Sequence, residues 1–115
     1  MRVAVASSDG KFINQHFGHT QQFYIFEKLE DRFQFLERRI GKAFCDGGEH
    51  DDTKLKEAID NIDDCAYVLT VQVGYGAVEA LHERGISVRI AVGFIDDCLK
   101  EFFRELTKGT DECIS

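Results

Sequence analysis

Apolar and polar positions along the chain predict an alternation of strands and helices. Residues 2–7 predict a first strand, and the apolar run from Val3 to Ala6, which no polar residue interrupts, is typical of a strand buried on both faces. Asp9-Gly10 then predicts a tight turn into a short strand at residues 11–13. Residues 22–28 and 33–40 carry the next two apolar runs, and the charged residues between them indicate a hairpin.

In the second half of the chain, the apolar residues recur at the spacing of helices as well as of strands. After Asp51 or Asp52, either of which can cap a helix, apolar residues recur at positions 55, 58, 59 and 62. A nearly unbroken apolar run at residues 65–71 indicates an interior strand. We expect the remaining elements to be a helix that Gly74-Tyr75-Gly76 opens and Gly85 ends, a strand at residues 86–90, and a helix at residues 94–106.

This order of elements predicts an α/β fold. An antiparallel hairpin followed by crossover units gives a mixed sheet with helices on both faces, and the same order is found in ribonuclease H-like folds. We expect one domain over residues 1–108 and a frayed tail at residues 109–115, since a chain of 115 residues fits a single hydrophobic core.

Composition and charge narrow the function classes. A formal net charge of −7 opposes broad contact with phosphate backbones, so nucleic acid is not an expected partner. No apolar run approaches the roughly 18 residues that a membrane span requires, and the N-terminal apolar stretch is too short for a signal peptide. We expect a cytoplasmic protein without membrane contact. Its four cysteines form no C-x-x-C pair, which excludes the usual zinc-finger and ferredoxin motifs.

The most unusual local feature is a pair of histidines, His16 and His19, in a polar loop that contains Gly18. Functional groups often lie on loops held by a rigid sheet, and imidazole is a common metal ligand. A histidine on a surface is also often merely solvated. From composition alone the two interpretations are equally well supported.

Cys45 is the cysteine whose neighbours, Asp46-Gly47-Gly48, are loop formers. A thiolate there could bind a soft metal or a sulfide cluster, although an ordinary exposed cysteine is the simpler reading. Cys65 and Cys98 fall on apolar positions, so we expect both to be small core residues, and Cys113 to be inert in the tail.

Gly74-Tyr75-Gly76 follows a buried strand and precedes a helix, where free backbone amides could face an anion. The triplet is not a dinucleotide motif, because Glu79 stands where the third glycine would be. Close packing of the helix on the sheet would explain these glycines equally well.

Hydrolytic chemistry lacks its usual residues. A nuclease of the ribonuclease H type needs carboxylates that converge on two metal ions, the first of them on the first strand, and residues 3–7 carry none. Neither a G-x-S-x-G elbow nor a Walker loop is present in the sequence. Hydrolysis by any of these routes is therefore not expected.

Several of these segments together resemble the nitrogenase iron-molybdenum cofactor biosynthesis family, which includes the NifX and NafY carriers and the C-terminal domain of the NifB synthase. The resemblance extends from Val3 to Ile90. It rests on residues 3–10, on Asn14-Gln15-His16-Phe17-Gly18-His19 with Phe23-Tyr24-Ile25-Phe26, on Cys45-Asp46-Gly47-Gly48, and on residues 62–69 with Gly85-Ile86. The paired histidines and the glycine loop after Cys45 resemble the synthase domain more than NifX.

The resemblance implies a domain that is not an enzyme, but binds an iron-sulfur or molybdenum-containing cluster and transfers it from a donor protein to an acceptor. The cargo would be the iron-molybdenum cofactor, its precursor, or a related cluster such as a molybdenum-copper sulfide. His16, which precedes Phe-Gly, would be the principal metal ligand, with His19 auxiliary and Cys45 a further candidate. Other residues expected to contact the cluster are Ser8, Asp9, Gly10, Asn14, Phe17, Gly18, Gly74 and Gly76.

Carriage agrees with the chemistry of so few ligands. Four thiolates hold a cluster firmly, whereas one or two histidines and one cysteine leave it exchangeable. Sulfide clusters are anions, so an acidic protein must supply local donors, and we expect these to be the histidines and the amides near residues 7–10 and 74–77. Two alternatives stay open at this point: a small redox protein or enzyme that uses Cys45 with His50, and a metal-free adaptor that binds a protein or an oxyanion.

Overall fold

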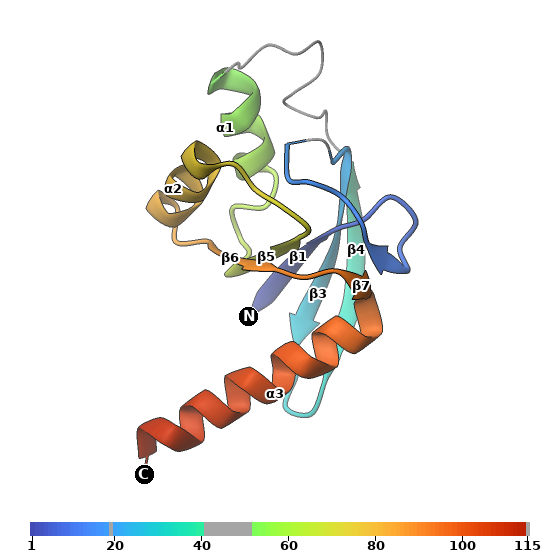
Figure 1. The fold of residues 1–115 in the computed structure, drawn as a ribbon, viewed down its shortest axis with the longest axis vertical. Coiled ribbons are helices and arrows are strands. Elements are labelled where there is room, and N and C mark those ends of the chain that lie inside the picture. The colour runs from blue at the N-terminus through green and yellow to red at the C-terminus, as the bar shows by residue number, and fades with distance from the viewer. Residues whose placement is uncertain (19, 41–51, 115) are drawn as a thin grey trace.

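The computed structural model describes residues 1–18, 20–40 and 52–114. Its main element is a five-stranded sheet with the order β4-β3-β1-β5-β6 (Figure 1). The central strand β1 pairs antiparallel with β3 and parallel with β5, and β3 and β5 then pair with β4 and β6. The strand bounds are β1 (Arg2–Ala6), β3 (Gln22–Lys28), β4 (Phe33–Ile40), β5 (Tyr67–Thr70) and β6 (Ser87–Ile90).

Three helices in the described ranges cover the sheet, and a small second sheet pairs two of the connections. The helices are α1 (Asp52–Asp60), α2 (Tyr75–Glu83) and α3 (Ile95–Ile114), and the second sheet pairs β2 (Phe12–Ile13) with β7 (Gly93–Phe94). The expected α/β fold, with a mixed sheet and an initial hairpin, is confirmed.

The core lies on both faces of the sheet. Alternate residues of β1 divide between the faces, and Val3 to Ala6 are all fully buried. Ala4 and Ala6 belong to the cluster that packs under α1 and α2, while Val3 and Val5 belong to the cluster that α3 covers (Figure 1). Burial on both faces, as expected, therefore explains the uninterrupted apolar run in the sequence.

The last helix differs from its expected bounds. α3 begins at Ile95 and continues to Ile114, so the expected end at Leu106 is wrong. Its buried stripe includes Leu99 and Phe102, and the helix continues past the last residue of the apolar pattern in the sequence. Gly109 does not end the helix, since an interior glycine costs only about 1 kcal/mol relative to alanine. The division at residue 108 into a domain and a tail stays a prediction.

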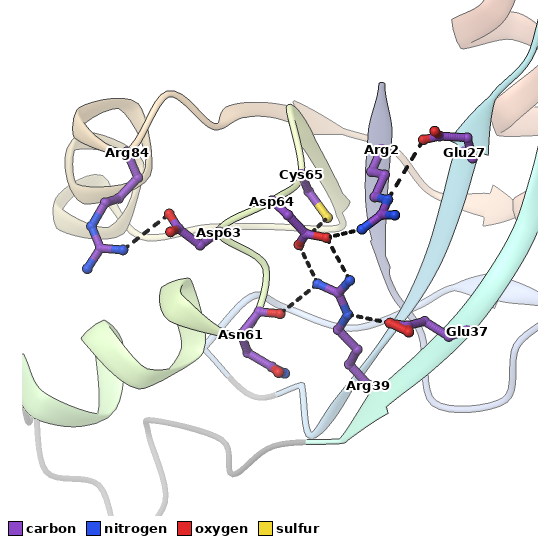
Figure 2. A network of polar contacts seen from close by, with 9 residues as sticks. All are labelled: Arg2, Glu27, Glu37, Arg39, Asn61, Asp63, Asp64, Cys65 and Arg84. Atoms are coloured by element: carbon purple, nitrogen blue, oxygen red, sulfur yellow. Dashed lines mark hydrogen bonds and ion pairs between the residues drawn. The ribbon is translucent and has the colours of Figure 1, made fainter.

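A network of charged side chains joins β1 and β4 to the connection between α1 and β5 (Figure 2). Arg39 donates to both carboxylate oxygens of Asp64, over 2.5 and 2.8 Å, and Arg2 donates to Asp64 over 2.6 Å. Hydrogen bonds from these guanidinium groups hold the pKa of Asp64 well below its usual value.

Among the described helices, none is both long enough and apolar enough to cross a bilayer.

Candidate functional site

The carboxyl ends of the parallel strands bring together the loops that the sequence singled out. Because β1, β5 and β6 run in the same direction, the connections that follow them begin at one edge of the sheet. Residues 7–10 follow β1, and residues 71–74 lead from β5 into α2. We call this part of the molecule the carboxyl edge. It is the usual place for a ligand crevice in such sheets.

The histidine segment, residues 14–18, is held against the end of β5. His16 forms a parallel bridge with Gln72, in which the Phe17 amide donates to the Gln72 carbonyl over 2.8 Å. On the other side of His16, the Val71 amide donates to the Gln15 carbonyl over 3.1 Å. These bonds extend the parallel pairing of the sheet by one short segment.

His16 and Phe17 lie differently although they are neighbours. The Phe17 side chain is only 1% exposed, and its ring centroid lies 5.8 Å from that of Phe23 in the core under α1 and α2. His16 is exposed. The buried aromatic ring therefore anchors the segment and leaves the preceding imidazole at the surface.

The loop after β1 is stabilised by its own side chains. Ser7, which is fully buried, accepts hydrogen bonds at Oγ from the amides of Asp9 and Gly10. The Asp9 carboxylate accepts from the amides of Lys11 and Phe12, and these two bonds lower its pKa. These bonds hold the chain in a tight turn, as expected for Asp9-Gly10.

Gly10 is required at this turn for two reasons. Its φ of +77° lies in the left-handed region, which residues with a Cβ rarely adopt. A Cβ at this position would also lie 3.0 Å from the Tyr24 ring. Any larger residue would therefore strain the backbone and push on a side chain of β3.

Asn14 and Gln22 connect this loop to the histidine segment and to β3. Asn14 accepts from the Ser8 amide at Oδ1 and donates to the Ser8 hydroxyl, each over 3.0 Å. The side-chain amide of Gln22 donates to the carbonyls of Ser7 and Ser8. The amides of residues 8–10, among those near residues 7–10 that we expected to face an anion, donate within this network, so these residues shape the carboxyl edge. Their contact with a cluster stays a prediction.

The start of α2 offers amides that the helix itself does not use. The first bond of the helix runs from the Val78 amide to the Gly74 carbonyl, so the amides of Tyr75, Gly76 and Ala77 precede it. Gly74 caps the helix without a side-chain hydrogen bond. A Cβ on Gly74 or on Gly76 would have no neighbour within 4 Å, so close packing does not explain these glycines.

A polar hollow of about 340 Å³ opens beside the histidine segment. It extends from the loop after β1 to the ends of β3 and β4. The residues that line it are Ser7, Ser8, Gln15, Thr20, Gln21, Gln22 and Ile40.

The remaining metal-binding candidates divide between described and undescribed parts of the chain. His19 and Cys45 lie outside the described residues, as does His50. Within the described ranges, no three His, Cys, Asp or Glu side chains come together as a metal site. Cys65 is buried and burial raises its pKa to about 12, while Cys98 is partly buried, in agreement with their expected core positions.

Two residues at the carboxyl edge were missed by the sequence analysis. Thr70 is fully buried, and its hydroxyl donates to the Gln15 carbonyl over 2.7 Å. Gln22 ties the loop after β1 to β3. The available signal was weak: each is a polar residue at the end of an apolar run, on the side of the carboxyl edge.

Comparisons with known proteins place the chain among cofactor-assembly proteins. The family model described as dinitrogenase iron-molybdenum cofactor matches residues 1–105. The chain is 35% identical over 102 residues to the FeMo cofactor biosynthesis protein NifB of Frankia alni, covering 86% of this chain and 20% of that protein. It is 34% identical over 112 residues to protein NifX of Azotobacter vinelandii, covering 95% of this chain and 69% of that protein.

The chain thus spans about a fifth of the length of the NifB relatives that it matches. Among solved structures, the apo form of the orange protein from Desulfovibrio gigas aligns with a TM-score of 0.65 and 16% sequence identity, over 90% of this chain and 88% of that one. This likeness concerns the fold alone.

Proposed function

The chain belongs to the dinitrogenase iron-molybdenum cofactor family, and we propose that it binds an iron-sulfur or molybdenum-containing cluster at the carboxyl edge and carries it to an acceptor protein. The cargo is the iron-molybdenum cofactor, its precursor or a related cluster such as a molybdenum-copper sulfide. The protein acts as a carrier and leaves the cluster chemically unchanged. A donor protein and an acceptor protein are its partners.

One observation carries the proposal: an exposed histidine is fixed on the backbone at the place where the sheet's loops meet. His16 lies between two backbone hydrogen bonds to residues 71 and 72, and the buried Phe17 ring follows it. A ligand with a fixed backbone loses less conformational freedom when it binds metal. An imidazole that is exposed can also reach a large inorganic cluster, which a buried side chain could not.

The start of α2 supplies hydrogen-bond donors for an anion, which a protein with a net charge of −7 needs if it is to bind one. A sulfide cluster is an anion, and the amides of residues 75–77 form the positive end of a helix dipole. Gly74 and Gly76 leave this backbone open to close approach. Because residues 71 and 72 pair with the histidine segment and then lead into α2, the imidazole and these amides belong to one connected unit.

The other predicted residues have secondary roles in this proposal. His19 and Cys45 add metal ligands, and so few protein ligands keep the cluster exchangeable. Phe17 and Gly18 belong to the segment that presents His16, and Asn14 ties that segment to the loop of Ser8, Asp9 and Gly10. We also propose a ribonuclease H-like classification of the fold, which the sheet order β4-β3-β1-β5-β6 supports.

The proposal predicts that His16→Ala weakens cluster binding. The wild-type protein, incubated without oxygen with iron and sulfide or with thiomolybdate, should develop charge-transfer absorption in the visible range. His16→Ala should lose most of this absorption, because the removed imidazole is the principal ligand. The measurement is absorbance together with bound iron, molybdenum and sulfide per chain.

His82→Ala is the matched control. His82 is likewise exposed, but it lies in the last turn of α2, far along the helix from Gly74. Its removal should leave the spectrum and the metal content unchanged. Equal spectra for His16→Ala and the wild type would remove His16 from the ligand role, and a wild-type protein that takes up no cluster would overturn the proposed function.

A further inference from the structure

The Thr70 side chain forms a hydrogen bond to the histidine segment. Thr70 is the last residue of β5, it is fully buried, and its hydroxyl donates to the Gln15 carbonyl over 2.7 Å across a sequence separation of 55 residues. The same carbonyl accepts the Val71 amide over 3.1 Å. The Gln15 carbonyl, immediately before His16, is therefore held by two donors from consecutive residues of the β5 end.

We propose that Thr70 is a positioning residue for His16, and that its hydroxyl fixes the histidine segment to β5. A buried hydroxyl is almost always satisfied by a partner. The Thr70 hydroxyl lies 3.4 Å from the Gln72 carbonyl but only 2.7 Å from the Gln15 carbonyl, so its main partner is the backbone of the histidine segment. Valine at this position would fill the core equally well, since its shape is that of threonine. The hydroxyl thus supplies orientation where an apolar side chain would supply only packing.

The consequence for the cargo rests on the proposed function. Since the segment carries the principal ligand, a looser segment spends part of its time with the imidazole displaced from the cluster. The hydroxyl of Thr70 therefore lengthens the time for which the cluster stays bound. Its contribution is local, because the bond joins one loop to one strand end.

The first measurement needs no cluster. In Thr70→Val, amide hydrogen exchange at Phe17 should be about threefold to tenfold faster than in the wild type, which is the effect of one net hydrogen bond. The Phe17 amide reports the segment because it donates to the Gln72 carbonyl. Exchange at Leu69, in the body of β5, should change much less. Thr70→Ser, which keeps the hydroxyl, should restore slow exchange at Phe17.

Thr107→Val is the matched control. The Thr107 hydroxyl also donates to a backbone carbonyl over 2.7 Å, that of Phe103, but within α3 on the other face of the sheet. This variant makes the same chemical change and should leave exchange at Phe17 unaltered. Unchanged exchange in Thr70→Val would overturn the positioning role, and so would equal acceleration at Phe17 and Leu69, which would mark a general loss of stability.

The second measurement uses protein reconstituted with iron and sulfide. Thr70→Val should lose iron to a chelator about threefold to tenfold faster than the wild type and Thr107→Val. Loss at the wild-type rate would overturn the role of Thr70 in cluster retention. If the wild type binds no cluster while exchange at Phe17 responds to Thr70 as expected, the proposed function fails and the positioning of the histidine segment stands.

Discussion

At the residue scale, the two ends of α2 use glycine for different reasons. Gly85 follows the helix with a φ of +78°, in the left-handed conformation that ends many helices. Gly76 lies inside the first turn, and a Cβ there would have no neighbour within 4 Å. The backbone conformation requires Gly85, whereas Gly76 leaves open space beside the start of the helix.

Replacing each of these glycines by alanine should therefore have opposite effects on stability. Gly76→Ala should raise the free energy of unfolding by about 0.5 kcal/mol, because alanine restricts the unfolded chain and suits a helix. Gly85→Ala should lower it by about 1 kcal/mol, because alanine disfavours the left-handed conformation. Urea denaturation of the two variants checks both signs. A stabilising Gly85→Ala would contradict the assignment of a conformational role to that glycine.

Cys65 should resist alkylation in the folded protein. Burial raises its pKa to about 12, so very little thiolate exists near pH 7.5. Iodoacetamide followed by peptide mass spectrometry should show Cys65 modified mainly after unfolding in urea. Cys98, whose pKa is also raised by burial but which is less buried, should react sooner. Rapid labelling of Cys65 in the native protein would show that this part of the core opens readily.

At the element scale, the sequence predicts the hairpin better than any other part. The strands at residues 22–28 and 33–40 have the expected bounds, because apolar runs on both sides of a charged turn define a hairpin locally. The strand β7 could not be foreseen. It has two residues, and it exists because Phe94 pairs with Phe12, which lies 82 positions earlier in the chain.

The candidate site shows the same division between local and distant causes. The sequence identified the histidine segment as an unusual loop, and the structure pairs it with the end of β5. Thr70 carries only a weak local signal and Gln72 none, because their role depends on residues 55 or more positions away. Nor could the sequence tell that Gly74 and Gly76 face open space, which depends on how α2 is placed on the sheet.

The ion pairs around Asp64 should make the free energy of unfolding depend on pH in the acid range. Arg39 and Arg2 lower the pKa of this carboxyl, so its ionised form favours the folded state. The contribution is present above the usual value of 3.8 and is lost as the pH falls below it. Asp64→Asn should lower the free energy of unfolding at pH 7 by about 1 kcal/mol, a modest figure because solvent screens the partly exposed pair.

Urea denaturation at a series of pH values checks this prediction. Between about pH 5 and pH 2, Asp64→Asn should lose less stability than the wild type, because its amide does not titrate. Asp63→Asn is the neighbouring control; that residue is more exposed and contacts Arg84 instead. Parallel stability curves for the wild type and Asp64→Asn would refute the account.

At the scale of the whole molecule, α3 alone among the described helices covers its face of the sheet (Figure 1). Phe102 is central to that contact: it is 2% exposed, and its ring centroid lies 5.9 Å from that of Phe33 and 4.8 Å from that of Tyr67. The Arg89 guanidinium lies over the same ring and also pairs with Glu105. One side chain thus connects α3 to β4, β5 and β6.

Phe102→Ala should therefore lower the free energy of unfolding by about 3 to 4 kcal/mol, since a large buried ring leaves a cavity. Phe94→Ala should cost much less, because Phe94 is 55% exposed and mainly contacts Phe12. Thermal or urea denaturation compares the two. A similar loss for both variants would mean that α3 is not the main cover of this face.

The central place of β1 in the sheet has a consequence for folding during synthesis. Strand β1 precedes both of its neighbours in the chain, and one of them, β5, begins only at Tyr67. Until β5 is synthesised, one edge of a strand whose residues 3–6 are all apolar has no hydrogen-bonding partner, and such edges pair with other chains. Nascent chains shorter than this should therefore depend on chaperones, and fragments that stop before Tyr67 should aggregate.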